Sequence, residues 1–340
     1  MAGAATPEQA RLLSELLDRR LLIATGVPGV YGRGAEFERV REQLAALVSR
    51  EVAPEHPEQM RFPPVLARRD LEKVGYLKSF PHLAGAIFAF EGSEQDAAEQ
   101  YERASRHEDW SEFQTMSDLV LTPAACYPVY PAVAARGRLA SGGLTVDAGG
   151  AYVFRREPSG DPARLQMFHQ REIVRIGEPR AVQAWRDRWR ERALELLGGL
   201  GLRARLDVAS DPFFGRSGRM LAASQREQEL KFEVLAEIAG PEPTAVASFN
   251  YHQDHFAAAY GIELADGAVA HTACLGFGLE RITLALLVTH GFEPQRWPAQ
   301  VRERLRADGG PERDEQLQAD GRAEADAAGA GGEPPQAGGA

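Results

Sequence analysis

Cysteine is scarce in this chain: its 340 residues include only Cys126 and Cys274. Two cysteines cannot build the disulfide framework of a small secreted domain. Long apolar runs are also missing, because no segment approaches the roughly 18 residues of a membrane-spanning helix. The first 20 residues carry mixed charges and therefore differ from a signal peptide. We therefore expect a cytoplasmic protein that does not associate with a membrane.

An excess of positive charge is absent as well. The formal net charge is −10, which argues against a globally basic nucleic-acid binder. Residues 307–340 hold eight acidic residues and two arginines, and Leu317 is their only large apolar residue. Burial of such a segment cannot offset the entropy lost on ordering it. The sequence predicts one folded domain over residues 1–306, followed by a disordered acidic tail, rich in Gly and Ala, over 307–340.

Apolar residues at helical spacing predict several amphipathic helices. The four leucines of the first 20 residues mark one helix, and residues from Phe37 to Val48 mark a longer one. The segment 92–110 is polar and helical, and a helix over Ala181–Leu197 lies in an arginine-rich insert at about 180–206. That helix buries Trp185 and Trp189 and directs four arginines largely outward: Arg186, Arg188, Arg190 and Arg192.

A β-hairpin is predicted in the middle of the chain. Two strands, 151–157 and 165–176, are joined by the turn-forming sequence PSGDPA. Because strand side chains alternate between faces, Arg155 and Glu157 share one face of the first strand. On the returning strand, one face collects an aromatic ring and two polar side chains: Phe168, Gln170 and Glu172.

The C-terminal part of the folded region contains ACLGFGLER, from Ala273 to Arg281. We interpret it as a strand, a glycine turn and a helix that closes at Gly291. It is not a dinucleotide-binding glycine motif, because Arg281 replaces the third glycine and too little chain remains for a βαβ unit. An arginine in the first helical turn instead favours a phosphate group.

Each cysteine has a simple structural interpretation as a small buried hydrophobe. Cys126 lies in SDLVLTPAACYPVYP, whose prolines predict a rigid loop or an irregular strand, and Cys274 precedes the glycines. Their spacing contains no C-x-x-C pair. Spacing alone therefore does not distinguish metal ligands from buried apolar residues.

In combination, these segments resemble motifs 2 and 3 of class II aminoacyl-tRNA synthetases. Motif 2 is matched by FRRE at Phe154–Glu157 with the returning strand, and motif 3 by Gly-x-Gly-x-x-Arg. The Phe37–Val48 helix and the proline-bearing strand through Pro63 resemble motif 1, the dimerisation element. The resemblance covers residues 26–291 and implies an α+β fold, in which an antiparallel sheet is flanked by helices, and a homodimer.

Within this superfamily, QMFHQRE and the HT before the glycines are most similar to seryl-type enzymes. Atypical members hold zinc with a cysteine, a glutamate and a second cysteine that are widely separated in sequence. Cys126, Glu172 and Cys274 match those positions. The resemblance therefore implies a Zn²⁺ site, with Cys126 and Glu172 also contacting the amino acid substrate.

The same resemblance implies an ATP site. Arg155 would hold the α-phosphate and Arg281 the γ-phosphate, while Phe168 stacks on adenine and Glu157 accepts a hydrogen bond from the adenine amino group. From the residues alone, Arg155 and Glu157 could equally form an ion pair, and Phe168 could belong to the core. Three further residues are implied around the nucleotide and its Mg²⁺: Lys231, Ser248 and Asn250.

One feature departs from a synthetase, because only about thirty residues precede the motif 1 region. The large N-terminal tRNA-binding domain of the atypical seryl enzymes is missing, and no tRNA partner is expected. The chain is more similar to the amino acid:carrier-protein ligases, truncated relatives that use ATP to load a small amino acid, glycine or alanine, onto the phosphopantetheine thiol of a carrier protein. We expect the carrier to dock near Arg186 and Arg190.

Two alternatives stay open at this point. One is minimal seryl-type aminoacylation of tRNA, and the other is a non-catalytic paralogue that binds an amino acid or adenylate as a regulator. Retention of Arg155, Glu157 and Arg281 disfavours the second alternative. The sequence does not choose between glycine and alanine.

Overall fold

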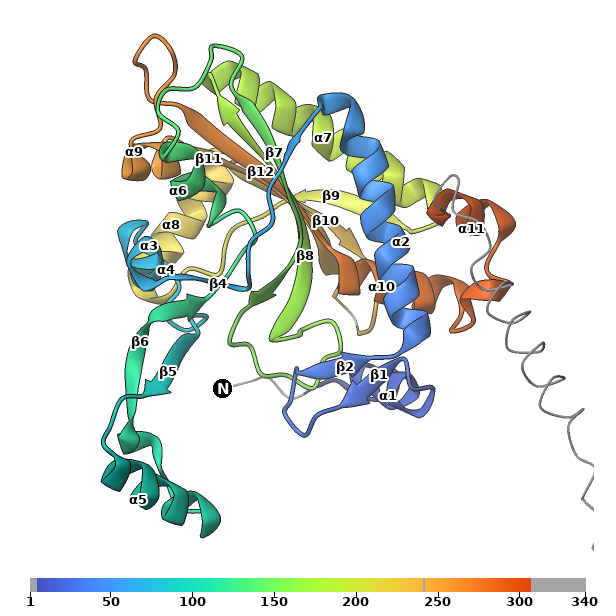
Figure 1. Cartoon of the computed structure of the whole chain (residues 1–340). Coiled ribbons are helices and arrows are strands. Elements are labelled where there is room, and N and C mark those ends of the chain that lie inside the picture. Colours follow the sequence, from blue (N-terminus) through green and yellow to red (C-terminus); the bar gives the residue numbers. More distant parts are fainter. Residues whose placement is uncertain (1–4, 241, 307–340) are drawn as a thin grey trace, which may run out of the picture. The chain divides into compact units, whose positions relative to one another are not determined.

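A computed structural model describes residues 5–240 and 242–306, so the predicted tail over 307–340 lies outside the described residues. The main feature is a seven-stranded sheet (Figure 1). Its strands, in spatial order, are β3 (Glu58–Gln59), β7 (Leu144–Phe154), β8 (Met167–Gly177), β12 (His271–Gly278), β11 (Thr244–Gln253), β10 (Lys231–Ala236) and β9 (Ala204–Val208). All neighbours are antiparallel except β3 and β7.

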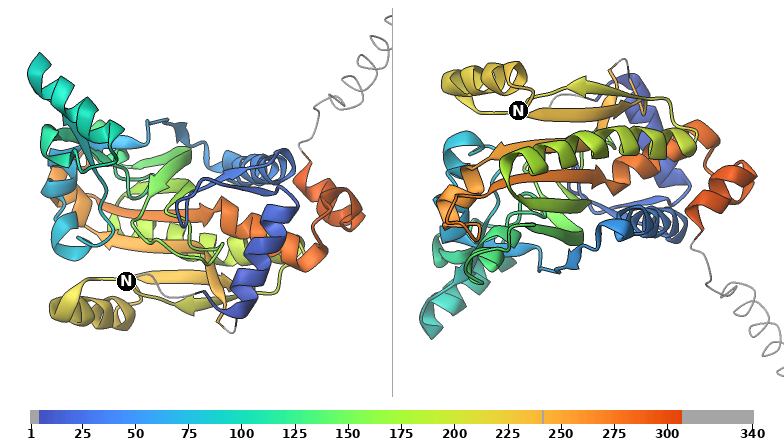
Figure 2. Two further views of the ribbon diagram at one scale, coloured as in Figure 1. Left: turned by 90° about the horizontal axis from the view of Figure 1, so that it is seen from below. Right: turned by 90° about the horizontal axis from the view of Figure 1, so that it is seen from above.

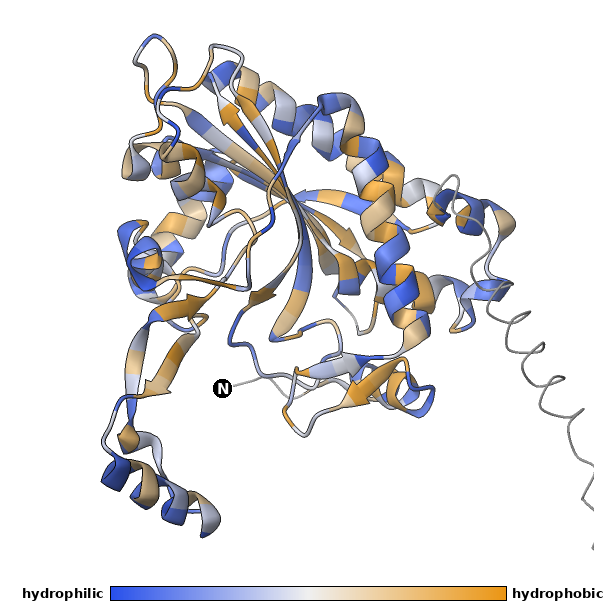
Figure 3. Cartoon of the chain, viewed as in Figure 1, coloured by the Kyte–Doolittle hydropathy of each residue, from blue (hydrophilic) through white to orange (hydrophobic). Residues whose placement is uncertain are grey.

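Two smaller sheets complete the β structure. One contains β4 (Val65–Ala67), β6 (Gln114–Leu121) and β5 (Ala86–Phe90) in that order, and the other pairs β1 (Leu22–Ala24) with β2 (Tyr31–Arg33). The predicted polar helix is confirmed as α5 (Glu94–Ser105), between β5 and β6. Apolar residues recur on β5 and along the large sheet (Figure 3).

Three long helices cover one face of the large sheet: α2 (Ala35–Val52), α7 (Pro179–Gly199) and α10 (Leu279–His290). Figure 2 shows α7 running along the strands. The other helices are α1 (Pro7–Asp18), α3 (Arg68–Lys73), α4 (Tyr76–Ser79), α6 (Val129–Ala134), α8 (Gly215–Glu227), α9 (His255–Tyr260) and α11 (Ala299–Leu305). The architecture confirms the predicted α+β fold. Among the described helices, none combines the length and apolar content needed to span a bilayer.

Strand alternation gives the large sheet two different faces. Ile173, Leu275 and Phe277 are fully buried in the apolar cluster that contains α2, α7 and α10. Their neighbours Glu172 and Cys274 therefore point to the opposite face. This opposite face carries the polar residues of the candidate site.

The first hairpin strand differs from the prediction. β7 begins at Leu144, earlier than expected, and ends at Phe154, so Arg155 and Glu157 lie in the connection and do not share a strand face. The reason is a change of backbone partner: the N–H of Arg156 donates to the carbonyl oxygen of Leu83, away from the hairpin (3.1 Å). β8 matches the predicted second strand closely.

The predicted orientation of Arg186 is wrong. Its side chain is only 3% exposed, and one guanidinium nitrogen donates to the carbonyl oxygen of Glu229 at 2.7 Å. The guanidinium also lies 5.0 Å from the ring centroid of Phe232. Because Phe232 belongs to the helix-covered face, α7 packs on the face opposite the candidate site. Arg186 therefore cannot provide an exposed carrier-docking charge.

Before Lys231 lies the helix α8, and the strand β10 begins at Lys231. One other local prediction needs correction. The glycines of ACLGFGLER do not form a turn, because both Gly276 and Gly278 belong to β12. A Cβ at Gly276 would lie 3.0 Å from Nε2 of Gln170, so a larger residue there would require that side chain to move.

The proline-bearing strand of the motif 1 region is also interrupted. β3 ends at Gln59 and β4 begins at Val65, so Pro63 and Pro64 lie between two strands that belong to different sheets. Proline has no N–H to donate to a strand ladder, which explains the break. The preceding helix, α2, is present and longer than predicted.

Candidate active site

A cavity of about 410 Å³ opens on the polar face of the large sheet. β8, β10, β11 and β12 supply its floor, and the segments around Cys126 and Asp211 supply its walls. The cavity is lined by nine of the ten predicted site residues: Cys126, Arg155, Phe168, Glu172, Lys231, Ser248, Asn250, Cys274 and Arg281. Residues from four strands, two loops and the first turn of α10 thus converge on one space.

Glu157 is the predicted residue that does not line this cavity. Its carboxylate lies 4.0 Å from a guanidinium nitrogen of Arg164, which is an exposed and long contact. The expected contact between Glu157 and the adenine amino group stays a prediction.

Cys126, Glu172 and Cys274 form a buried cluster in which the ligand atoms all lie within 4.8 Å of one another. The backbone N–H of Cys126 donates to Oε2 of Glu172 at 2.5 Å, and Sγ of Cys274 lies 3.5 Å from Oε1 of Glu172. Strand register explains why Glu172 and Cys274 lie close together. Glu172 of β8 pairs with Gly276 of β12, and Cys274 lies two residues before Gly276 on the same face. Gly276 leaves space beside that carboxylate.

The donor set of this cluster fits a zinc ion. Two sulfur atoms and one carboxylate are ligands that zinc accepts in proteins. Burial raises the pKa of Glu172, and the neighbouring thiol of Cys274, with burial, raises that of Cys126. The raised pKa values mean that deprotonating these adjacent buried groups costs free energy. A bound divalent cation would remove that cost. The three residues could therefore hold a metal.

Two guanidinium groups meet at the other part of the cavity. Nε of Arg281 donates to the carbonyl oxygen of Ala163 at 2.7 Å, and Nη1 donates to that of Ala245 at 2.9 Å. Arg155 donates to the carbonyl oxygen of Pro123. Burial, followed by the nearby charge of Arg155, lowers the pKa of Arg281. An anionic ligand such as a phosphate would compensate both charges.

Phe168 stands beside these arginines. Its ring centroid is 5.6 Å from the guanidinium carbon of Arg155. Phe168 is only partly buried and lines the cavity, so it is available for stacking on a planar ligand.

Lys231 is held by two acidic neighbours. Its Nζ lies 2.7 Å from Oδ1 of Asp211 and 3.0 Å from Oε1 of Glu233. Asp211 also makes a two-point contact with Gln225 of α8, through its backbone N–H and its carboxylate. Sequence reasoning missed Asp211 and Gln225, because no motif connects them.

Two more residues near the thiols were missed. His252 lies beside Cys274, and Tyr130 lies near Cys126. Burial lowers the pKa of His252 to about 3, so the imidazole is neutral. A histidine two residues after Asn250 was the available signal, since alternate residues of a strand share a face.

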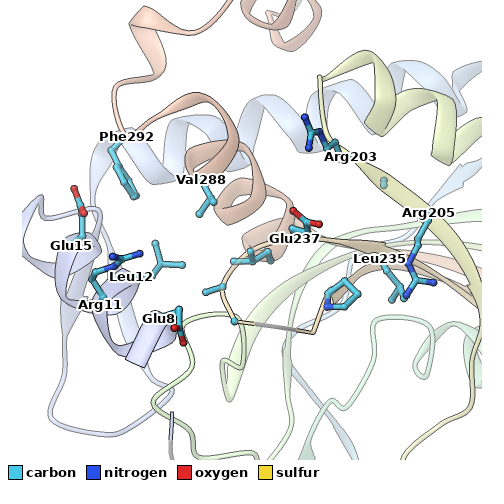
Figure 4. A pocket seen from close by; sticks show the side chains of 15 residues that line it. Glu8, Arg11, Leu12, Glu15, Arg203, Arg205, Leu235, Glu237, Val288 and Phe292 are labelled. Atoms are coloured by element: carbon cyan, nitrogen blue, oxygen red, sulfur yellow. The ribbon is translucent and has the colours of Figure 1, made fainter. Parts of the chain in front are cut away.

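A second, larger groove of about 1080 Å³ lies between α1, α10 and the β9–β10 edge (Figure 4). It is lined by apolar residues and by charges of both signs, including Arg11, Arg203, Arg205, Glu8, Glu15 and Glu237. Among the described residues that line it, none is a predicted site residue. The smaller cavity is therefore the candidate active site.

Comparison with solved structures defines the class of this fold. The chain superposes on the seryl-tRNA synthetase of Methanopyrus kandleri with a TM-score of 0.74 at 20% identity, covering 90% of this chain and 62% of that one. The seryl-tRNA synthetase of Pyrococcus horikoshii, solved with ATP, gives 0.61 at 17% identity, covering 90% and 64%. The chain thus has the catalytic-domain fold of class II aminoacyl-tRNA synthetases.

Sequence relatives then define the family. Two proteins of Bradyrhizobium diazoefficiens, named amino acid--[acyl-carrier-protein] ligase 1 and 2, are 47% and 48% identical over 306 and 301 residues, covering 88% of this chain and 93% and 89% of theirs. This chain belongs to the amino acid–acyl-carrier-protein ligase family. The type-2 serine–tRNA ligase of M. kandleri is 32% identical over 153 residues, which is 42% of this chain and 28% of that protein. No protein-family model matches the chain.

Proposed function

We propose that this chain is an ATP-dependent ligase that activates a small amino acid, glycine or alanine, as an aminoacyl-adenylate and transfers it to the phosphopantetheine thiol of a carrier protein. One observation supports this most directly. In a member of the ligase family, the Cys126–Glu172–Cys274 cluster and the two cavity arginines share one cavity of about 410 Å³. A site for an amine thus lies beside a site for phosphates.

The first half-reaction makes an acyl phosphate bond. A carboxylate oxygen of the amino acid attacks the α-phosphorus of ATP, the bond between the α-phosphorus and the bridging oxygen breaks, and pyrophosphate leaves. Arg155 holds the α-phosphate and Arg281 the γ-phosphate, while Phe168 stacks on adenine. The positive charges of the two arginines offset the repulsion between the substrate carboxylate and the phosphates of ATP. Mg²⁺ bound to the phosphates would act in the same way. Lys231, Ser248 and Asn250 line the same space.

The second half-reaction forms the thioester. The carrier thiolate attacks the carbonyl carbon of the adenylate, the carbon–oxygen bond to AMP breaks, and AMP leaves. No protein nucleophile is required. The chain must instead orient the adenylate and exclude water, because water would hydrolyse the activated acyl group.

Cys126, Glu172 and Cys274 would hold the zinc ion. Bound there, zinc would supply a Lewis acid that favours the neutral form of the substrate amine. With three ligands supplied by the protein, zinc could also bind that amine, which would favour amino acids over simple carboxylic acids. Discrimination between glycine and alanine is limited, because one methyl group changes binding by roughly 1–3 kcal/mol.

We propose that the carrier docks on α8. Leu221 of α8 lines the cavity and is 46% exposed, and the neighbouring Met220 is 74% exposed. Arg216 and Arg219 are also exposed on this helix. A carrier with acidic and apolar surface would therefore meet matching side chains where the cavity opens. We further propose a homodimer that uses α2 and β3, the elements of the motif 1 region.

Pyrophosphate exchange with each of the twenty amino acids tests the first half-reaction. We expect ATP formation from labelled pyrophosphate with glycine or alanine and with few others. Mass spectrometry of a phosphopantetheinylated carrier then tests the second, by the mass added as a thioester. Exchange without carrier loading, together with charging of tRNA on a filter, would instead support seryl-type aminoacylation. Absence of exchange with every amino acid would support a non-catalytic role.

A further inference from the structure

Two buried polar side chains flank the Cys126–Glu172–Cys274 cluster, one beside each sulfur, and the proposed reaction does not use them. Nε2 of His252 lies 3.5 Å from Sγ of Cys274. The hydroxyl of Tyr130 is buried near Cys126 and has no hydrogen-bond partner among the described residues. Tyr130 is fully buried. An unpaired buried hydroxyl has a cost, so its position beside a sulfur requires a reason.

Local structure aims both groups at the cluster. His252 follows Asn250 on the cavity face of β11, and the pairing of β11 with β12 shifts register between Tyr251 and Gln253. Such an irregularity re-aims a side chain at the end of a strand. Tyr130 is placed by the short helix α6, which follows the Cys126 loop directly.

One aromatic ring holds the two groups. Phe256 of α9 stacks on Tyr130 with ring centroids 4.1 Å apart and an interplanar angle of 8°. The same ring meets His252 edge-on at 4.9 Å and 87°. The two polar groups are therefore fixed by packing and not merely close to the sulfur atoms.

The donor and acceptor pattern suits deprotonated sulfur. Nδ1 of His252 lies 3.1 Å from Oγ1 of the fully buried Thr272. If the threonine hydroxyl donates to Nδ1, the imidazole proton is on Nε2 and points at Cys274. Two thiolates and a carboxylate carry three negative charges, one more than a divalent cation neutralises. Neutral N–H and O–H donors offset that excess without adding another charge.

We propose that His252 and Tyr130 are positioning residues of the metal site: they donate hydrogen bonds to the sulfur atoms of Cys274 and Cys126 and thereby set how tightly the site holds zinc. This inference rests on the zinc site of the proposed function. Hydrogen bonds to ligand atoms of this kind typically change metal affinity by 10–100-fold when removed.

The experiment compares full-length wild-type protein with His252→Leu, His252→Gln and Tyr130→Phe. Zinc affinity is measured by competition with a chelating dye. The metal is then replaced by Co²⁺, and the absorption band of charge transfer from sulfur to cobalt is recorded. We expect roughly tenfold weaker zinc binding and a shifted band for His252→Leu and Tyr130→Phe. His252→Gln keeps an N–H near the sulfur and should recover much of the affinity.

Tyr260→Phe is the matched control. The Tyr260 hydroxyl, on α9, donates to the carbonyl oxygen of Asp70 at 3.1 Å and belongs to a partly buried ring. Its loss should leave zinc affinity and the cobalt band unchanged. Tyr130→Phe removes a single oxygen atom, so it carries the test if His252→Leu does not fold.

The outcomes separate this inference from the proposed zinc site. Wild-type protein that binds no stoichiometric zinc overturns both. Wild-type binding with equal affinity and an unchanged cobalt band in Tyr130→Phe and His252→Leu overturns only the role of these two residues. An equal loss in Tyr260→Phe would show a general packing effect and would also overturn it.

Discussion

Glu280 accepts hydrogen bonds from the backbone N–H of His169 through both carboxylate oxygens, each at 2.9 Å. This contact joins the first turn of α10 to β8 at the residue between Phe168 and Gln170, both of which line the cavity. Arg33 of β2 donates to the same carboxylate at 3.1 Å. One buried side chain thus connects the N-terminal hairpin, the strand beneath the cavity and α10.

Glu280→Ala should destabilise the protein by about 3 kcal/mol, because it leaves the largely buried Arg33 guanidinium without this partner. The KM for ATP should also rise, since β8 loses the contact that holds it beside Phe168. Urea unfolding and pyrophosphate exchange measure the two effects. The control is Glu15→Ala, which removes an exposed pair with Arg19 and should cost under about 0.5 kcal/mol. Equal effects in the two variants would contradict this role.

Arg281→Lys should reduce kcat/KM for ATP in pyrophosphate exchange by about 100-fold or more, on the scale of losing one preorganised donor to a developing charge. Lysine cannot donate to both carbonyl oxygens that hold Arg281 and still face a phosphate. Arg205→Ala, in the second groove, is the matched control and should leave exchange unchanged. A small change for Arg281→Lys would remove this arginine from the phosphate site.

Cys126→Ser and Cys274→Ser should each lower the zinc content well below one ion per chain and abolish exchange with an amino acid. The reason is that each removes one of three protein ligands within a single cluster. Metal analysis of the purified variants and exchange assays after chelator treatment provide the measurement. Activity should return when zinc is added back to chelated wild-type protein. Full activity of the double serine variant would refute the metal site.

Carrier loading should depend on α8 and not on the outer side of α7. Arg216→Glu and Arg219→Glu together should raise the KM for the carrier several-fold and leave pyrophosphate exchange intact, because both arginines are exposed beside the cavity-lining Leu221. Arg188→Glu, an equivalent reversal on α7, is the control. If only the α7 variant affects thioester formation, the docking surface is on the other face of the sheet.

Stability should depend on pH through Asp211. Burial opposes ionisation of this carboxyl, but the charge of Lys231 and hydrogen bonds to it hold its pKa below the ordinary value. Its folded pKa is therefore below the unfolded value of about 3.9, and the stabilisation is present above that pH and lost as the pH falls through the folded pKa. Asp211→Asn should therefore be less stable than wild type at neutral pH in urea unfolding, and this difference in stability should disappear at low pH. A deficit that is constant from pH 7 to 3 would contradict this.

Several features of the site could be predicted from local pattern alone. Period-two alternation placed Phe168, Gln170 and Glu172 on one face of β8, and the structure confirms that all three line the cavity. Such predictions succeed because a strand has only two faces. The predicted roles of these residues with nucleotide, amine and metal stay predictions.

Other features could not be predicted, because they depend on partners distant in sequence. Arg186 looked like an exposed charge by helical spacing, but Phe232 and the carbonyl oxygen of Glu229 bury it. Asp211 and Gln225 belong to no motif. They become part of the site because β10 places Lys231 in contact with both Asp211 and Glu233, and Gln225 holds Asp211.

The sequence by itself determined the secondary-structure periodicity, the scarcity of cysteine and the motifs that identify the superfamily, since composition and local pattern do not depend on how the chain folds. Only the tertiary structure decided that Cys126, Glu172 and Cys274 meet within 4.8 Å, and that His252 and Tyr130 stand beside the two sulfur atoms. The physical reason is that strand order, register and loop packing bring distant residues together. These arise from the burial of apolar surface over the whole domain.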